Sequence, residues 1–238
     1  MFRRLRPRIL VVSFPKRGAL KILAAILLAL LLFQRERAVE TLSDGATVMI
    51  DPGHGGADGG AVSGSILEKD LNLDIARRVS RKLPGSGRTA TLSRENDTDL
   101  SRFSRSLADP ITRDLDGRVQ LAAARDANVL VSIHANHVRE NYVRGPIVYY
   151  RTASRRSLEL ANYIQSELNA LDPSRGHRPR EAGFYLLRNF GGPAVLVEVG
   201  FLSNPSDRER LAQSEYRERF ARAIGGGILK FYRSEVER

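Results

Sequence analysis

The stretch Val129-Leu130-Val131-Ser132-Ile133-His134 decides the fold. Up to Ile133 it is a short apolar run rich in β-branched side chains, which is typical of a strand buried on both faces. Similar runs occur at residues 47–50 and 194–197, and each run is followed at once by a polar residue. Buried strands of this kind belong to sheets that helices cover on both sides.

Helical patterns separate these strands. Residues 67–83 and 154–171 each place an apolar side chain on one face at every third or fourth position. The alternation predicts a single α/β domain whose twisted, mostly parallel or mixed sheet is flanked by helices on both faces. Further elements are predicted from the same signals: strands at 89–93, 147–150 and 184–187, helices at 118–127 and, with a break near 213–214, at 206–232, and a charged irregular excursion at 94–117.

The N-terminus carries most of the positive charge. Residues 1–45 hold nine Lys/Arg against three Asp/Glu, in a chain of 238 residues with a net charge of +11. A basic segment, residues 1–21, leads into an apolar segment, residues 18–33, which approaches the length of a membrane span if Lys21 reaches back to the headgroups. This order predicts an N-terminal hydrophobic helix that anchors the protein in the cell membrane, with residues 1–21 in the cytoplasm and the chain after residue 34 outside.

Two other interpretations of the apolar segment are open. A signal peptide would be cleaved and the protein secreted, but Gln34-Arg35-Glu36-Arg37 stands where small residues are needed for cleavage. A buried core helix is disfavoured because no polar face interrupts the segment. Residues 34–45 are interpreted as a linker to a domain at residues 46–233. The positive charge of the N-terminus precedes a membrane segment, and the domain lacks a stripe of basic and aromatic residues. Anionic lipid is therefore favoured over nucleic acid as the partner of the basic segment.

Candidate metal ligands stand where strands and helices meet. His54 and His134 each follow a predicted strand, and Glu68 begins the first long helix. The chain has no cysteine, so a metal would need His, Asp or Glu ligands. These three side chains would leave a fourth position open for water, which is the pattern of catalytic zinc. A lone histidine near a strand end usually does not bind metal. Here, however, two of the four histidines, His54 and His134, both follow a predicted strand.

Glu198 closes the run at 194–197, where a charged group would be costly to bury without a function or a partner. The glycine-rich residues 53–60 lack both a P-loop and a dinucleotide fingerprint, so phosphate binding is disfavoured. We assign no catalytic role to four further polar residues near these segments, which are Asp51, His137, His177 and Arg188.

Four segments together carry a resemblance to a known family. They are Ile50-Asp-Pro-Gly-His-Gly-Gly-Ala-Asp-Gly-Gly-Ala61, Leu67-Glu-Lys-Asp-Leu-Asn-Leu73, Ser132-Ile-His-Ala-Asn136 and Val197-Glu-Val-Gly-Phe-Leu-Ser-Asn-Pro205. In this order they closely resemble the zinc-dependent N-acetylmuramoyl-L-alanine amidases of bacterial cell walls. The resemblance implies that His54, Glu68 and His134 bind Zn²⁺ and that Glu198 is the catalytic carboxylate. The expected reaction is hydrolysis of the amide between the lactyl group of N-acetylmuramic acid and L-alanine in peptidoglycan.

Within this family the chain is most similar to the germination-specific spore-cortex amidases, which are short, carry an N-terminal anchor and lack wall-binding repeats. That similarity implies a role in forming muramic δ-lactam during cortex maturation. Vegetative wall turnover, a catalytically silent wall-binding scaffold and a zinc-dependent sugar deacetylase are the alternatives. The need for an activator protein is left open.

Overall fold

The computed structural model describes residue 26 and residues 45–83, 88–172 and 176–237. The predicted basic N-terminus, the predicted anchor and most of the predicted linker lie outside the described residues. None of the helices within these ranges has both the length and the apolar character that a membrane span needs. Residues 43–238 group into one compact unit, which contains the elements given below.

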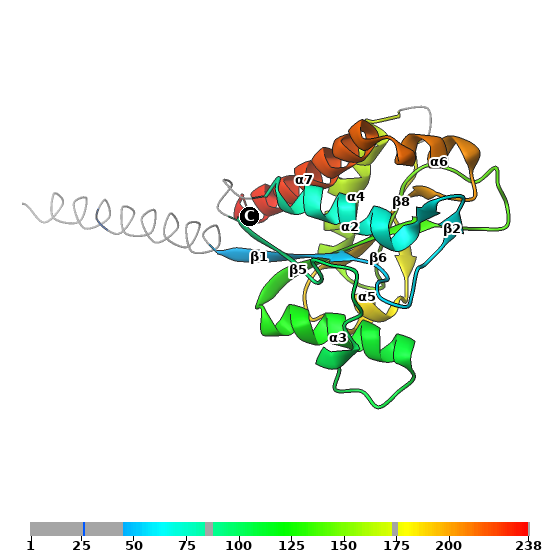
Figure 1. Ribbon diagram of the computed structural model, residues 1–238. Helices are drawn as coiled ribbons and strands as arrows, with labels where there is room; N and C mark the ends of the chain where they lie inside the picture. The colour runs from blue at the N-terminus through cyan, green and yellow to red at the C-terminus, as the bar shows by residue number, and fades with distance from the viewer. Residues whose placement is uncertain (1–25, 27–44, 84–87, 173–175, 238) are drawn as a thin grey trace, which may run out of the picture. The chain divides into compact units, whose positions relative to one another are not determined.

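A six-stranded mixed sheet, in the order β4-β1-β5-β8-β6-β7, forms the centre of this unit (Figure 1). The first four strands in that order run parallel, β6 is antiparallel to β8, and β7 is parallel to β6. A short hairpin of β2 and β3 leads directly into the first described long helix. The strands are β1 (Ala46–Pro52), β2 (Val62–Ser63), β3 (Ile66–Leu67), β4 (Arg88–Leu92), β5 (Ala127–Asn136), β6 (Ile147–Arg151), β7 (Arg180–Ala182) and β8 (Ala194–Phe201).

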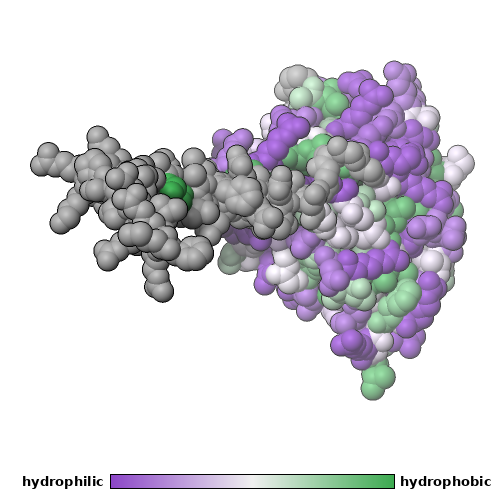
Figure 2. All heavy atoms as spheres, turned by 90° about the vertical axis from the view of Figure 1, so that its left-hand side faces the viewer, coloured by the Kyte–Doolittle hydropathy of each residue, from purple (hydrophilic) through white to green (hydrophobic). Residues whose placement is uncertain are grey.

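Helices cover both faces of the sheet, as predicted. One face carries the larger apolar cluster, in which side chains of α2 (Glu68–Ser80), α4 (Arg155–Asn169) and α7 (Ser214–Val236) pack on β1, β5 and β8. The other face carries a smaller cluster formed with α3 (Pro110–Ala124) and α5 (Tyr185–Asn189). Among the described residues from 45 onward, the remaining helices are η1 (Ser101–Phe103) and α6 (Pro205–Ala212), which ends just before α7 at the predicted break. On the side that Figure 2 shows, the described surface is mainly hydrophilic with small apolar areas between.

The strand register determines which side chains point to the sheet face that α3 and α5 cover. Parallel pairing places Asp51 beside Ser132 and His134 beside Glu198. Since alternate residues of a strand point to opposite faces, these polar side chains continue the row that buries Met49 and the other strand residues of the smaller cluster. On the sheet face that α3 and α5 cover, the strand side chains are therefore apolar along most of their length and polar at the carboxyl ends of the parallel strands.

One predicted helix has different bounds, and one predicted strand was wrong. The helix predicted at 118–127 begins at Pro110, because Asp109 caps it by accepting hydrogen bonds from the backbone N–H groups of Ile111 and Thr112 at 3.0 and 3.1 Å. Residues 110–117 of the predicted irregular excursion are thus helical. The strand predicted at 184–187 is the short helix α5, since a short apolar run has no period that separates strand from helix.

Candidate metal centre

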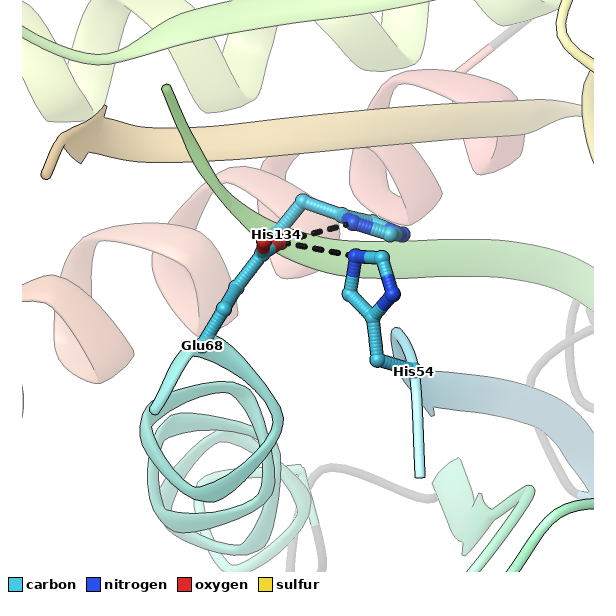
Figure 3. Close-up of side chains that lie close together, drawn as sticks. All are labelled: His54, Glu68 and His134. Atoms are coloured by element: carbon cyan, nitrogen blue, oxygen red, sulfur yellow. Dashed lines mark hydrogen bonds and ion pairs between the residues drawn. The ribbon is translucent and has the colours of Figure 1, made fainter. Parts of the chain in front are cut away.

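Three side chains predicted as ligands meet at the carboxyl end of the sheet. His54 follows β1, His134 lies in β5, and Glu68 is the first residue of α2 (Figure 3). One potential ligand atom from each lies within 4.8 Å of the other two. Glu68 Oε1 is 3.1 Å from both His54 Nε2 and His134 Nδ1. The three donors therefore already face a common point.

Glu68 is held in place by backbone groups as well as by the imidazoles. The N–H of Ala61 donates to Oε2 at 2.8 Å, and the N–H of Ala135 donates to Oε1 at 3.1 Å. The Asn72 amide, one turn along α2, donates to Oε1 at 3.3 Å. Burial raises the pKa of Glu68, but the hydrogen bonds and charges of His134 and His54 outweigh burial and hold that pKa well below its ordinary value. Glu68 is consequently an ionised carboxylate, the form that binds metal.

His54 has a second carboxylate partner. Its Nδ1 lies 2.7 Å from Asp58 Oδ2, while its Nε2 faces Glu68. Burial lowers the pKa of His54, but Glu68 and then Asp58 raise it to about 9. A ligand imidazole must be neutral, so metal binding here would release a proton. A carboxylate on the far nitrogen of a metal-binding histidine fixes the orientation of its ring, and the sequence reasoning missed Asp58 although it lies within the glycine-rich motif.

Two glycines leave room for the ligands. A Cβ atom on Gly53 would lie 2.2 Å from the His134 ring. On Gly60 it would lie 2.7 Å from both Glu68 Oε2 and His54 Cδ2. The glycine-rich loop therefore lets the backbone pass close to the donors.

Glu198 faces the same cavity from β8. The cavity, about 770 Å³ in volume, is lined by His54, His134 and Glu198 together with side chains of α3 and α5. Glu198 is 8% exposed, and its Oε2 accepts no hydrogen bond from any residue in the described ranges. Burial raises the pKa of its carboxyl group to about 7, with Glu68 adding to the rise and the two histidines opposing it. A carboxyl group with this pKa can take up and return a proton near neutral pH.

The other polar candidates lie apart from the cluster. Asp51 is buried beside the cavity and accepts hydrogen bonds from Ser93, Ser132 and Arg118 rather than from a ligand side chain. His137 and Arg188 are exposed. His177 is 3.0 Å from the backbone oxygen of Arg144. None of these three lines the cavity.

The donor set fits a catalytic metal site. Two imidazoles and one carboxylate, with a second buried carboxylate on the same cavity, are characteristic of metal-dependent hydrolases. The comparisons with known proteins then place the chain in one family. Residues 48–230 match the family model described as N-acetylmuramoyl-L-alanine amidase. The chain belongs to the N-acetylmuramoyl-L-alanine amidase family, which confirms the resemblance seen in the four motifs.

Individual relatives agree with this assignment. The germination-specific N-acetylmuramoyl-L-alanine amidase of Bacillus subtilis (strain 168) is 38% identical over 194 residues, which are 79% of this chain and 80% of the relative. The N-acetylmuramoyl-L-alanine amidase LytC of the same strain is 40% identical over 191 residues, but this chain spans only 36% of its length. The solved CwlD amidase of Clostridioides difficile, in complex with the GerS lipoprotein, superimposes with a TM-score of 0.73 at 32% identity, covering 79% of this chain and 99% of that one.

Proposed function

We propose that this protein is a zinc-dependent amidase that hydrolyses the bond between the lactyl group of N-acetylmuramic acid and L-alanine in peptidoglycan. His54, Glu68 and His134 are the proposed zinc ligands, and Glu198 is the proposed catalytic carboxylate. The observation that carries the proposal is a cluster of three donors, two of which line one cavity with the buried Glu198. Its Oε2 has no hydrogen-bond partner among the described residues. Family membership supplies the bond that is cut.

Zinc is the metal that this donor set supports best. Imidazole and carboxylate ligands in a ratio of two to one, with one position left for water, are found in catalytic zinc sites. When bound, Zn²⁺ polarises a carbonyl group and lowers the pKa of a water molecule towards about 7. The absence of cysteine from the sequence leaves histidine and carboxylate as the donors available.

Glu198 carries the proton in the proposed reaction. Its ionised carboxylate takes a proton from the attacking water, whose oxygen forms a bond to the lactyl carbonyl carbon. The carbon–nitrogen bond then breaks, and the carboxyl group gives its proton to the leaving nitrogen of L-alanine. In the metal-free protein burial raises the pKa of Glu198 to about 7, and a raised pKa favours the return of the proton to the leaving nitrogen. No covalent bond to the protein forms.

Spore-cortex maturation is the proposed biological role. Its support is the 38% identity to the germination-specific amidase, of which this chain covers 80%. Membrane attachment through residues 18–33, with the domain outside the cell membrane, is proposed from the basic and apolar order of the N-terminus. A protein partner is also proposed, because the similar CwlD amidase was solved in complex with the GerS lipoprotein.

The test is product analysis with the full-length protein in detergent. Cortex and vegetative peptidoglycan are digested, and the soluble products are identified by mass spectrometry with and without a zinc chelator. Stem peptides with a free alanine amine, released only without chelator, are expected, with faster release from cortex. Release of acetate would instead show a deacetylase. Binding without any product would show a silent scaffold, and equal release from the two substrates would contradict the cortex preference.

A further inference from the structure

Two buried arginines lie behind the loop that carries His54. Arg94 follows β4 and is 3% exposed, and Arg118 lies in α3 and is 2% exposed. Neither is a proposed metal ligand, and burying a guanidinium group is costly unless its N–H groups all find partners. The partners of these two groups are therefore informative.

Four of the eight hydrogen bonds that the two guanidinium groups donate go to carbonyl groups of the His54 loop. Arg118 donates from Nη1 to the oxygen of Pro52 at 2.8 Å and from Nη2 to the oxygen of His54 at 2.7 Å. Arg94 donates from Nε to the same Pro52 oxygen at 3.0 Å and from Nη2 to the oxygen of Gly53 at 3.0 Å. Three successive carbonyls at the end of β1 are thus satisfied by two planar guanidinium groups.

Arg94 also connects the loop to the helix that carries Glu68. The Nη2 group that binds Gly53 donates to the backbone oxygen of Lys69 at 2.8 Å. Lys69 is the residue after Glu68, in the first turn of α2. One nitrogen atom therefore fixes the backbone beside His54 relative to the backbone beside Glu68.

Carboxylates balance the charge of Arg118. Asp51 Oδ1 accepts from Nη1 at 2.7 Å, and Asp114 Oδ2 accepts from Nε at 2.7 Å. Every nitrogen of this guanidinium group therefore has a partner, which fixes its orientation towards the loop.

The backbone of His54 needs such support. Its φ angle is +62°, in the left-handed region that non-glycine residues rarely adopt. A conformation of this kind persists where the surrounding structure holds it. Arg118 binds the carbonyl group of this same residue, so it acts directly on the strained position.

We propose that Arg94 and Arg118 are positioning residues for the metal centre. They fix the separation and orientation of His54 and Glu68 and thereby raise the affinity for zinc. This inference rests on the proposed zinc ligands. Lysine cannot replace either arginine, since a single ammonium group lacks the planar fork that spans several carbonyl oxygens.

Arg217 provides a matched control. It lies in α7 and donates to the backbone oxygens of Leu211 and Ala212 at 2.8 and 2.9 Å and to Asp74 at 2.5 Å. It thus also joins a guanidinium group to carbonyls and a carboxylate, but none of these four residues lines the cavity.

The test compares Arg94→Lys, Arg118→Lys and Arg217→Lys in the full-length protein. Zinc affinity is measured by competition with a chelator, the ligand geometry by the visible absorption of the Co²⁺-loaded protein, and the fold by circular dichroism. We expect zinc affinity to fall about 10- to 100-fold in the first two variants, with a changed Co²⁺ spectrum. Arg217→Lys should keep the wild-type affinity and spectrum, whatever its effect on thermal stability.

Each other outcome has a definite meaning. Wild-type affinity and spectrum in Arg94→Lys and Arg118→Lys would overturn the positioning role. If neither of these two folds while Arg217→Lys does, the arginines are required for the fold rather than for the metal, and the proposal is again overturned. Wild-type protein that binds no zinc would instead refute the proposed metal centre itself.

Discussion

Replacing Glu198 by glutamine separates the catalytic role of this carboxylate from the cost of burying it. Glutamine keeps the shape of the side chain but can neither ionise nor carry a proton. As the proposed general base is lost, turnover should fall about 10²- to 10⁴-fold. The effect on stability should go in the opposite direction at alkaline pH, because the buried charge is removed.

The size of this stability effect follows from the pKa of the Glu198 carboxyl group in the metal-free protein. Burial raises the pKa of Glu198 from 4.5 to about 7, and at 1.36 kcal/mol for each pKa unit the difference amounts to about 3 kcal/mol. A raised folded-state pKa gives stability that is fully present below pH 4.5 and is lost as the pH rises through about 7. Wild-type protein should therefore lose about 3 kcal/mol between pH 4.5 and pH 8 that Glu198→Gln keeps.

The assay is urea denaturation of both metal-free proteins at pH 4.5 and pH 8. The free energy of unfolding is compared within each protein, so any constant effect of the glutamine amide cancels. Titrating groups that do not interact with Glu198 are shared by the two proteins and cancel in the same way. If the free energy of unfolding changes equally with pH in both, the carboxyl group of Glu198 does not have a raised pKa, and the reasoning about its burial is refuted.

Two further predictions concern groups that support the ligands. Gly53→Ala should displace His134, since the added Cβ would lie 2.2 Å from the imidazole ring. Equilibrium dialysis should then show weaker zinc binding. Unchanged zinc binding would mean that the ring has room to move. Asp58→Asn removes the negative charge 2.7 Å from His54 Nδ1. The zinc affinity, measured by chelator competition, should fall about 10- to 100-fold. A wild-type zinc affinity would show that Asp58 does not orient the His54 ring.

The α/β architecture and the three candidate ligands could be predicted from local signals in the sequence. Buried parallel strands are short apolar runs, and a polar residue directly after such a run lies at the edge where sites form. His134 and Glu198 follow this rule, and His54 lies in the loop directly after β1. Glu68 was a candidate from its place at the start of the first long helix, and the family motif supported it further, because an acidic residue at a helix start is common.

Other features depend on local geometry or on contacts that sequence spacing does not reveal. The start of α3 was missed because residues 94–117 are rich in charge, although Asp109 and Pro110 are a capping signal and Ile111 and Leu115 stand at helical spacing. Arg94 and Arg118 are separated by 41 and 67 residues from Gly53 and Asp51, the respective partners to which they donate. Their role emerges only when β4 and α3 pack beside β1.

The zinc content of purified full-length protein tests the central claim most directly. Wild type, His54→Ala and Glu198→Gln are loaded with zinc, dialysed and measured side by side by elemental analysis. The proposed site predicts about one zinc per chain in wild type and in Glu198→Gln, because Glu198 is not a ligand, and loss of zinc in a folded His54→Ala protein. Zinc-free wild type, or full zinc content in His54→Ala, would contradict the proposed metal centre.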